Sequence, residues 1–428
     1  MSPVTGIVAE FNPLHNGHRL MMEEARSRLG GAPCVVILSS NFTQRGEPAL
    51  CDKWTRAKMA LRCGADLVIE LPFFFACAAA PDFSAAAVDL LARTRLATHI
   101  AFGMEDAAHD IEPILDTLLH EPAPYRQRMK EELKRGASYP KAAANALEFL
   151  LPGAGTFASF PNNLLALSYL LRIRKRGYPL LPLPLPRHGE EHGALTLSPH
   201  ASAGALRAAL RQGAGIGDGS PLIGTMPSFS LELLREAEEA GRLCRSAKKL
   251  WPMLQALLLR STPDGLRPMD GMDEGMEHLL LEHWRNAMSL DDFVGRCVSA
   301  RYTRGHIRRR LIHLLAGVDR ETACALRSAG VPYARVLGFT ARGRELLRAH
   351  RKDTALPFVT RLAAARGSLE QSLAGLEFRA SALYELLLPR PSLHREERQR
   401  PVIGYPGDSQ DANPAFAPFT LNGGLHAR

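Results

Sequence analysis

The sequence predicts an α/β protein with an N-terminal doubly wound parallel sheet and a C-terminal, mainly helical domain. Over the first 110 residues, short β-branched runs alternate with helix-period stretches, which is typical of parallel sheets covered by helices. The 428 residues exceed one ordinary core, so about two to three domains are expected. Hydrophobic residues at 46% and charged residues at 23% exclude disordered, collagen-like and coiled-coil chains.

Each part of the sheet domain has its own signal. Apolar and helix-period patterns predict strands at residues 6–11, 34–40, 65–71 and 99–102, and helices at 19–29, 53–63 and 84–95. The crossovers between parallel strands are expected to be right-handed. Ligands bind such sheets outside the carboxyl ends of the strands, so the loops that follow the strands are where function is expected.

The remainder of the chain is predominantly helical in pattern. Residues 179–186 (PLLPLPLP) lose backbone donors at each proline, so we expect an edge strand or a polyproline-like segment there, before a helix at 202–211. A glycine-rich break at 213–219 precedes successive helical segments with arginine-rich faces. The predicted domains are 1–215, with a helical insertion at about 111–177, then 220–390, and a loose polar tail at 391–428.

Composition limits the class of protein further. The formal net charge is +9, which suits an acidic partner such as nucleic acid but is also common as simple solubility charge. The longest apolar run, residues 73–80, is far shorter than the roughly 20 residues of a spanning helix, and no signal peptide precedes it. The seven cysteines show neither disulfide nor zinc spacing. We therefore expect a cytoplasmic protein with no membrane segment.

The strongest motif is His15-Asn16-Gly17-His18, which follows the first predicted strand and opens a helix. Two imidazoles and free N–H groups at a helix start form an anion site, and Gly17 allows close backbone approach. Imidazolium or neutral imidazole donors there would stabilise the charge that develops as pyrophosphate leaves an α-phosphate. The alternative is a pair of ordinary surface histidines.

This tetrad resembles the HxGH signature of the nucleotidyltransferase superfamily. Together with NFTQRGEPALCDKWTRAKMALRCGADLVIELP, AFGMED, PNNLLALSYL and RYTRGHIRRRLIHLL, it makes most of the chain up to about residue 350 similar to the tRNA(Met) cytidine acetate ligase family. The resemblance implies an ATP-dependent ligase that forms acetyl adenylate. It then transfers the acetyl group to N4 of the wobble cytidine of elongator tRNA(Met), giving N4-acetylcytidine.

The resemblance also implies a set of site residues. His15 and His18 would be catalytic, Gly103 would let the nucleotide lie against the backbone, and Asn162 or its neighbour Asn163 and Arg187 would contact ATP. Ser202 and Arg207, in the segment SAGALR, would hold the β- and γ-phosphates, although Gly204 replaces a hydroxyl residue of the family pattern. The segment that wraps ATP would comprise Ile7, Val8, Ala9, Glu10, Phe11, Asn12, Pro13, Leu14, His15, Asn16, Gly17, His18, Arg19 and Leu20.

Several of these residues could also have a purely structural role. A turn explains Gly103, helix capping explains Asn162 and Ser202, and surface exposure explains Arg187. In the loop at 41–53, Arg45 or Lys53 would neutralise a substrate carboxylate or a tRNA phosphate, unless the loop is only solvated. Glu70 has no required acid or base role, because the substrate itself supplies the nucleophilic carboxylate.

The second functional region is the arginine-rich segment RYTRGHIRRR at 301–310, which contains no acidic residue. Wound as a helix, it places Arg301, Arg304 and Arg308 on one face, while Ile307, Leu311 and Leu314 face a core. Such a stripe provides sequence-independent affinity for the phosphates of tRNA. The alternative is a solvated helix face.

The sequence thus favours a ligase that uses ATP, acetate and elongator tRNA(Met), with Mg²⁺ bound to the phosphates and no protein metal cage. No protein partner is indicated. Two other classes remain: an adenylyltransferase for a small coenzyme precursor, which needs no basic helical domain, and a non-catalytic tRNA-binding protein with a degenerate nucleotide site. Acetate-dependent release of pyrophosphate separates the three.

Overall fold

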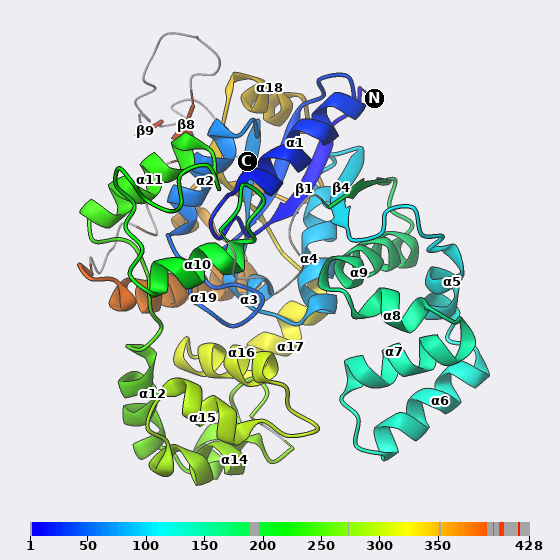
Figure 1. The fold of residues 1–428 in the computed structure, drawn as a ribbon, viewed down its shortest axis with the longest axis vertical. Helices are drawn as coiled ribbons and strands as arrows, with labels where there is room; N and C mark the ends of the chain where they lie inside the picture. Colours follow the sequence, from blue (N-terminus) through cyan, green and yellow to red (C-terminus); the bar gives the residue numbers. More distant parts are fainter. Residues whose placement is uncertain are drawn as a thin grey trace.

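The computed structural model describes residues 2–187, 197–272, 274–350, 352–391, 397, 402–405 and 418–419. Its centre is a sheet whose first four sequential strands are all parallel (Figure 1). The elements of this part are β1 (Thr5–Ala9), α1 (Asn16–Arg28), β2 (Cys34–Ser39), α2 (Lys53–Arg62), β3 (Leu67–Leu71), α3 (Phe73–Ala76), α4 (Ala80–Arg93) and β4 (His99–Met104). The predicted α/β class and the predicted parallel strands are confirmed.

Helices cover both faces of the sheet, which explains why its strands are nearly continuous apolar runs. Side chains alternate between the faces: Val35 and Ile37 of β2 belong to the hydrophobic cluster with α4, whereas Val36 and Leu38 belong to the cluster with α1 and α2. The register aligns Ile7 of β1 with Val36 of β2. The carboxyl ends of β1, β2 and β4 therefore meet at one edge of the sheet.

The proline-rich segment forms β5 (Leu181–Pro186), which pairs in parallel with β4 at the edge of the sheet. Leu181 and Arg187 donate their backbone N–H groups to Thr98 and Met104, so the odd-numbered residues face β4. The backbone nitrogens of the prolines at 182, 184 and 186, which carry no hydrogen, then point to the free edge, so no hydrogen bond of the sheet is lost. The predicted edge strand is confirmed.

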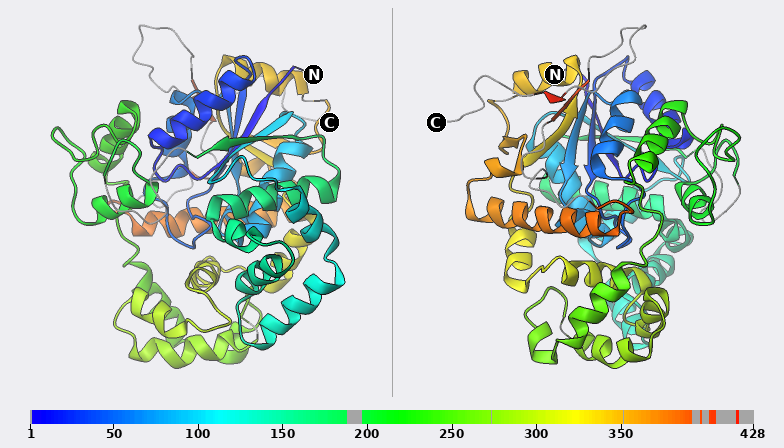
Figure 2. Two further views of the ribbon diagram at one scale, coloured as in Figure 1. Left: turned by 45° about the vertical axis from the view of Figure 1, so that its right-hand side comes forward. Right: turned by 90° about the vertical axis from the view of Figure 1, so that its left-hand side faces the viewer.

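The helical insertion between β4 and β5 is present. It comprises α5 (Glu112–His120), α6 (Ala123–Lys134), α7 (Tyr139–Leu150), α8 (Ala154–Ser159) and α9 (Pro161–Arg176). Helix α9 returns to the sheet domain, where Ala166 and Leu170 join the same hydrophobic cluster as Leu90 of α4. Helices α6 and α7 extend away from the sheet (Figures 1 and 2).

The second half begins with helices, as predicted. These are α10 (Ala203–Arg211), α11 (Ser228–Glu239), α12 (Leu250–Leu259), α13 (Pro263–Leu266), α14 (Met276–His283), η1 (Trp284–Asn286), α15 (Leu290–Cys297), α16 (Arg304–Leu315) and α17 (Arg320–Ala329). Residues of α12 to α16 form a separate hydrophobic cluster that includes Trp251, Phe293 and Leu311. The domain limits drawn from the sequence remain a prediction.

The expectation that only helical segments follow the glycine-rich break, as far as about residue 389, is wrong at two strands. Strand β6 (Ala334–Phe339) is buried along its whole length and runs antiparallel to β3 in the main sheet. The chain continues with α18 (Ala341–His350), β7 (Phe358–Val359), η2 (Leu362–Ala364) and α19 (Ser368–Leu387). The run ARVLGF lies between arginine-rich helices, and that context concealed a fully buried strand.

The loose tail is also corrected where the structure describes it. Strand β8 (Val402–Gly404) pairs with β6, and β9 (Pro418–Phe419) pairs with β8, so this segment extends the sheet. Most of the predicted tail lies outside the described residues, as does the whole of residues 188–193, which the sequence predicts to be a loop. No helix in the described ranges is long and apolar enough to cross a bilayer.

Candidate functional site

The HxGH tetrad lies at the carboxyl end of β1, and His15 is the N-cap of α1. Each histidine ring accepts a hydrogen bond from a backbone N–H group at the start of the helix. His15 Nδ1 accepts the N–H of Gly17 at 3.1 Å, and His18 Nδ1 accepts the N–H of His15 at 3.3 Å. The imidazole centroids are 3.8 Å apart, and the edge of the Phe11 ring contacts His18. Both rings are thus held in fixed orientations.

These contacts determine the tautomers. Because each Nδ1 accepts a hydrogen bond, the proton of each neutral ring lies on Nε2, which becomes a donor. Burial, followed by the charges of Arg187 and Arg207, lowers the pKa of His15 to about 4. Burial and the neighbouring His15 lower the pKa of His18 well below its ordinary value. Of the two protonation states considered from the sequence, the neutral one is therefore the state at pH 7.

The prediction of free N–H groups at the start of α1 is wrong. Asn16 donates its N–H to the carbonyl of Thr225, Gly17 donates to His15 Nδ1, and the N–H groups of His18 and Arg19 both reach the carbonyl of His15. A histidine at the N-cap satisfies the first turn itself. The donors left for an anion are consequently side chains.

Arg187 is one of these side chains. Its backbone N–H fixes it to the end of β4 through Met104, and its Nη1 lies 3.5 Å from Glu105 Oε1. Gly103 lies on the same strand, and a Cβ at this position would have no atom closer than Arg187 Cβ at 4.0 Å. The space beside Gly103 is therefore open, which fits a ligand against the backbone better than the alternative of a simple turn.

Asn162 and Asn163 do not cap α9, because the N-cap is Phe160 and it makes no side-chain cap bond. Both asparagines instead bind Glu105: Asn162 Nδ2 donates to Oε1 at 2.6 Å, and Asn163 Oδ1 accepts its backbone N–H at 2.9 Å. Asn163 is buried and fully engaged, whereas Asn162 is only half-buried. Sequence reasoning missed Glu105, although an acid after the strand in AFGMED was the available signal.

Arg207 of α10 provides the second arginine. Its Nη1 donates to the carbonyl of Asn12 at 2.7 Å, while its buried Nε has no partner in the described part of the chain. A buried guanidinium donor without an acceptor is costly, and a bound phosphate oxygen would satisfy it. Ser202 is the N-cap of the same helix, with Oγ accepting the N–H of Ala205 at 3.2 Å, so its capping role is confirmed.

The loop between β2 and α2 is packed against the HxGH segment and is not merely solvated. Glu10 Oε1 accepts the N–H of Gln44 at 2.8 Å, and Asn12 Oδ1 accepts the N–H of Leu50 at 2.8 Å. Arg56 is fully buried and donates to the carbonyl of Glu10 at 2.7 Å. Arg45 is exposed on this loop. These contacts join the first two strand-end loops into one rigid unit.

Lys53 does not reach a substrate, so that prediction is wrong. Its Nζ is buried and contacts Oε1 of three glutamates: Glu70 at 2.5 Å, Glu377 at 2.6 Å and Glu397 at 2.6 Å. Arg335 of β6 completes the group by binding Glu70 and Glu397. We call these five residues the buried charge cluster. It connects β3, α2, β6 and α19 inside the molecule.

The arginine-rich segment differs from its predicted geometry. Helix α16 begins at Arg304, so Arg301 precedes the helix and pairs with Glu274. Arg308 binds Glu47 and Asp291, two acidic residues from elsewhere in the sequence. The expectation of an arginine stripe without acidic partners is therefore wrong at this residue. The predicted core residues Ile307, Leu311 and Leu314 are buried as expected. The predicted one-face stripe is therefore wrong at Arg301.

Helix α16 also contacts the loop after β2. Arg309 Nη1 donates to the carbonyl of Gln44 at 3.1 Å. Gly46 has a φ of +71°, and a Cβ there would lie 2.5 Å from the backbone N of Arg309. Only glycine permits this approach. The arginine-rich helix is thus joined directly to the loop that supports the HxGH segment.

The site can bind a polyphosphate and stabilise charge that develops on it. Two neutral imidazole donors and two arginines converge at the carboxyl edge of the sheet, and the open space at Gly103 and the unpaired Nε of Arg207 fit a nucleotide. Within the described ranges, no group of three or more His, Cys, Asp or Glu side chains forms a metal site.

Comparisons with known proteins agree with this geometry. The family described as HIGH Nucleotidyl Transferase matches residues 2–400. The tRNA(Met) cytidine acetate ligase of Syntrophomonas wolfei is 35% identical, covering 94% of this chain and 99% of its own length. That of Acetivibrio thermocellus is 32% identical, covering 92% of this chain and 97% of its own length.

Two crystal structures share the fold. Apo Thermotoga maritima TmcAL superposes with a TM-score of 0.83 at 30% identity, covering 92% of this chain and 96% of that one. The same protein bound with alpha-thio ATP gives a TM-score of 0.80 at 29% identity, with the same coverage. The chain therefore belongs to the tRNA(Met) cytidine acetate ligase family of the HIGH nucleotidyl transferases.

Proposed function

We propose that this protein is an ATP-dependent acetate ligase that forms acetyl adenylate and transfers the acetyl group to N4 of the wobble cytidine of elongator tRNA(Met). The observation that carries the proposal is the pair of neutral histidines. Their Nε2 donors and the guanidinium groups of Arg187 and Arg207 meet at the carboxyl edge of the sheet.

In the first step, an acetate oxygen attacks the α-phosphorus of ATP, and the bond from that phosphorus to the pyrophosphate oxygen breaks. Pyrophosphate leaves with the bonding electrons. Acetate is already an anion at neutral pH, so no protein base is required. His15 and His18 stabilise the negative charge on the transferring and leaving oxygens, and neutral donors fixed in advance achieve this without reorganisation.

In the second step, the N4 amine of cytidine attacks the acetyl carbonyl carbon, and the carbon–oxygen bond to AMP breaks. AMP leaves with the bonding electrons and the N4 proton passes to solvent. The products are N4-acetylcytidine and AMP.

The ATP contacts proposed from the sequence fit these positions. Residues 7–20 form the strand, loop and first helical turn around the site. The remaining proposed contacts are Gly103, Asn162, Arg187, Ser202 and Arg207. Mg²⁺ is proposed on the phosphates, whose oxygens are the ligands it prefers, because residues of this chain need not coordinate it.

For the tRNA, we propose phosphate contacts from Arg301, Arg304 and Arg308. Arg301 and Arg304 are exposed, whereas Arg308 is partly engaged with Glu47. The connection of α16 to the loop after β2 supports communication between the tRNA and the nucleotide site. Acetate as the carboxylate, the absence of a protein partner and a cytoplasmic location belong to the same proposal.

The test is to incubate the full chain with labelled acetate, ATP and bulk tRNA and then to digest the tRNA to nucleosides. We expect label in N4-acetylcytidine, dependent on ATP. Pyrophosphate exchange only with a pantetheine or nicotinamide phosphate would instead indicate an adenylyltransferase, and tRNA binding without turnover would indicate a binding protein.

A further inference from the structure

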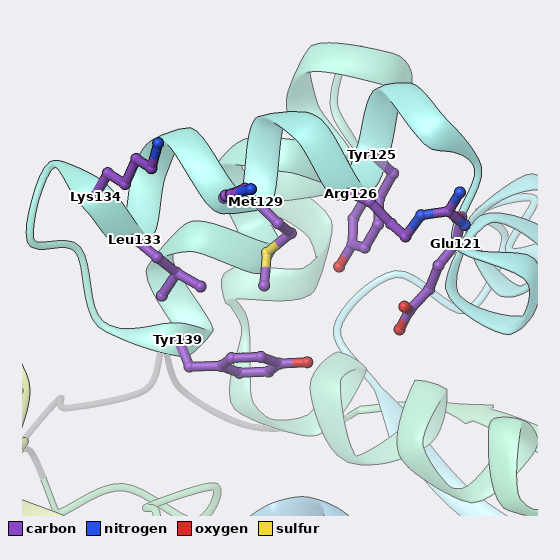
Figure 3. A pocket seen from close by; sticks show the side chains of 8 residues that line it. Glu121, Tyr125, Arg126, Met129, Leu133, Lys134 and Tyr139 are labelled. Carbon is purple, nitrogen blue, oxygen red and sulfur yellow. The ribbon is translucent and has the colours of Figure 1, made fainter.

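The helical insertion contains a pocket that no step of the proposed reaction uses. It lies along α6 and the start of α7 and has a volume of about 540 Å³ (Figure 3). Its lining residues are Glu121, Tyr125, Arg126, Met129, Lys130, Leu133, Lys134 and Tyr139.

One part of this pocket is aromatic and apolar. Tyr139 is 64% exposed and Leu133 is 43% exposed, which is unusual for large apolar side chains so close together. Figure 3 shows the ring of Tyr139 lying across the pocket, opposite Met129. Tyr125 lines the same pocket and is only 4% exposed. The pocket thus offers an exposed, flat ring face.

The other part of the pocket is positively charged. Lys130 and Lys134 are exposed and form no ion pair with any described residue, and Arg126 binds only the backbone carbonyl of Glu121 in the same part of the chain. Three cations therefore face one carboxylate. Two neighbouring arginines, Arg128 and Arg135, both bind Glu132 instead. Cations without an ion pair among the described residues thus lie beside the exposed aromatic ring.

An aromatic face next to unpaired cations matches the chemistry of an unpaired nucleotide, whose base stacks and whose phosphates carry charge. We propose that this pocket binds an unpaired nucleotide of the tRNA, with the base on Tyr139 and the flanking phosphates on Lys130 and Lys134. The inference rests on the proposed function, in which tRNA is the acetyl acceptor.

The position of the insertion supports this role. The chain enters it from the carboxyl end of β4, the edge that carries His15 and Arg187. Figure 1 shows α6 and α7 extending from the sheet on the same side as α14, α15 and α16. A tRNA held by α16 and by this pocket would therefore span the edge where the acetyl group is activated.

The test uses the full chain and variants at exposed positions that do not support the fold. Tyr139→Ala removes the ring, Tyr139→Phe retains it, and the double variant Lys130→Ala/Lys134→Ala removes two charges. Matched controls are Phe149→Ala, an equally exposed aromatic residue of α7, and Lys141→Ala, an exposed lysine of the same helix; neither lines the pocket. Binding is measured at several salt concentrations to elongator tRNA(Met) and to a fully paired RNA duplex of similar length.

We expect Tyr139→Ala to weaken tRNA binding about tenfold and to leave duplex binding unchanged, because a paired base cannot stack on the ring. Tyr139→Phe and both controls should bind tRNA like the wild type. The double lysine variant should flatten the slope of log K against log salt by about 1.4, for two phosphates of a single strand. Acetate-dependent pyrophosphate release without tRNA should not change in any variant.

Unchanged tRNA binding by Tyr139→Ala would overturn the inference, as would equal losses in Tyr139→Ala and Phe149→Ala or equal losses for tRNA and duplex. These outcomes leave the proposed function intact. A wild-type protein that does not bind tRNA at all would overturn the proposed function, and the inference with it.

Discussion

Two groups of charged residues lie around the same sheet and have opposite properties. In the HxGH site, Arg187 pairs with Glu105 at 3.5 Å, and Arg207 retains a buried donor without an acceptor among the described residues. In the buried charge cluster, Lys53 touches three carboxylates and is fully enclosed. The first group has donors that an anion can complete. In the second group the cations already pair with three carboxylates, although Nε of Arg335 also has no acceptor among the described residues.

The pKa shifts express the same difference. Burial acts to lower the pKa of Lys53, but Glu377, Glu397 and Glu70 outweigh it and raise the pKa above its ordinary range. Burial and the neighbouring Glu377 raise the pKa of Glu70 to about 7. Burial and the neighbouring cations Arg187 and Arg207 lower the pKa of His15 and keep it neutral. The charges that surround each residue, more than its type, distinguish the binding site from the structural cluster.

The largest expected effect is on stability. Replacing Lys53 with Met leaves the buried carboxylate of Glu377 without its cation and should lower the free energy of unfolding by about 3–5 kcal/mol. Chemical denaturation measures this change. Lys141→Met, at an exposed position on α7, should change stability by less than about 0.5 kcal/mol. Equal effects of the two variants would mean that the cluster does not hold the fold.

The next effect is on catalysis. His18→Ala removes one fixed donor from the site and should slow acetate-dependent pyrophosphate release about a hundred- to a thousandfold, equivalent to roughly 2.7–4 kcal/mol. The melting temperature should stay near that of the wild type. His120→Ala, at an exposed position on α5, is the matched control and should retain full activity. Normal turnover by the folded His18→Ala variant would remove His18 from the mechanism.

Local signals explain what the sequence predicted. The parallel strands and the HxGH loop depend on neighbouring residues, and the alternating prolines of β5 limit that segment to an edge strand or a polyproline-like conformation. Contacts between distant segments were not predictable: Arg308 and Glu47 are 261 residues apart, and Lys53 meets Glu377 across 324 residues. The sequence therefore could not show that Lys53 binds a buried glutamate and not the substrate, or that Arg308 pairs with an acidic residue.

The pH dependence of stability tests whether His15 is neutral in the folded protein. The folded state holds the pKa of His15 at about 4 against 6.5 when unfolded, so the unfolded chain binds more protons between these values. This contribution to stability is therefore present above pH 6.5 and lost as the pH falls towards 4. His15→Asn keeps an N-cap acceptor but cannot titrate. Its unfolding free energy should fall less steeply over that window, and an identical slope would contradict the neutral histidine.

The smallest effect concerns the arginines of the tRNA proposal, whose members differ in their partners. Arg301→Ala and Arg304→Ala should each flatten the salt dependence of log K for tRNA by about 0.7 to 0.9 and leave the melting temperature unchanged. Arg308→Ala should in addition lower the melting temperature, because it breaks the contact with Glu47. Unchanged salt slopes in all three variants would show that these arginines do not contact tRNA phosphates and have only a structural role.

The central claim is that the HxGH site activates acetate with ATP before tRNA takes part. Acetate-dependent exchange of labelled pyrophosphate into ATP, measured without tRNA, tests it most directly. We predict exchange by the wild-type protein that requires acetate and is lost in His18→Ala while the melting temperature is retained. Exchange that does not require acetate, or that His18→Ala performs at the wild-type rate, would contradict the claim.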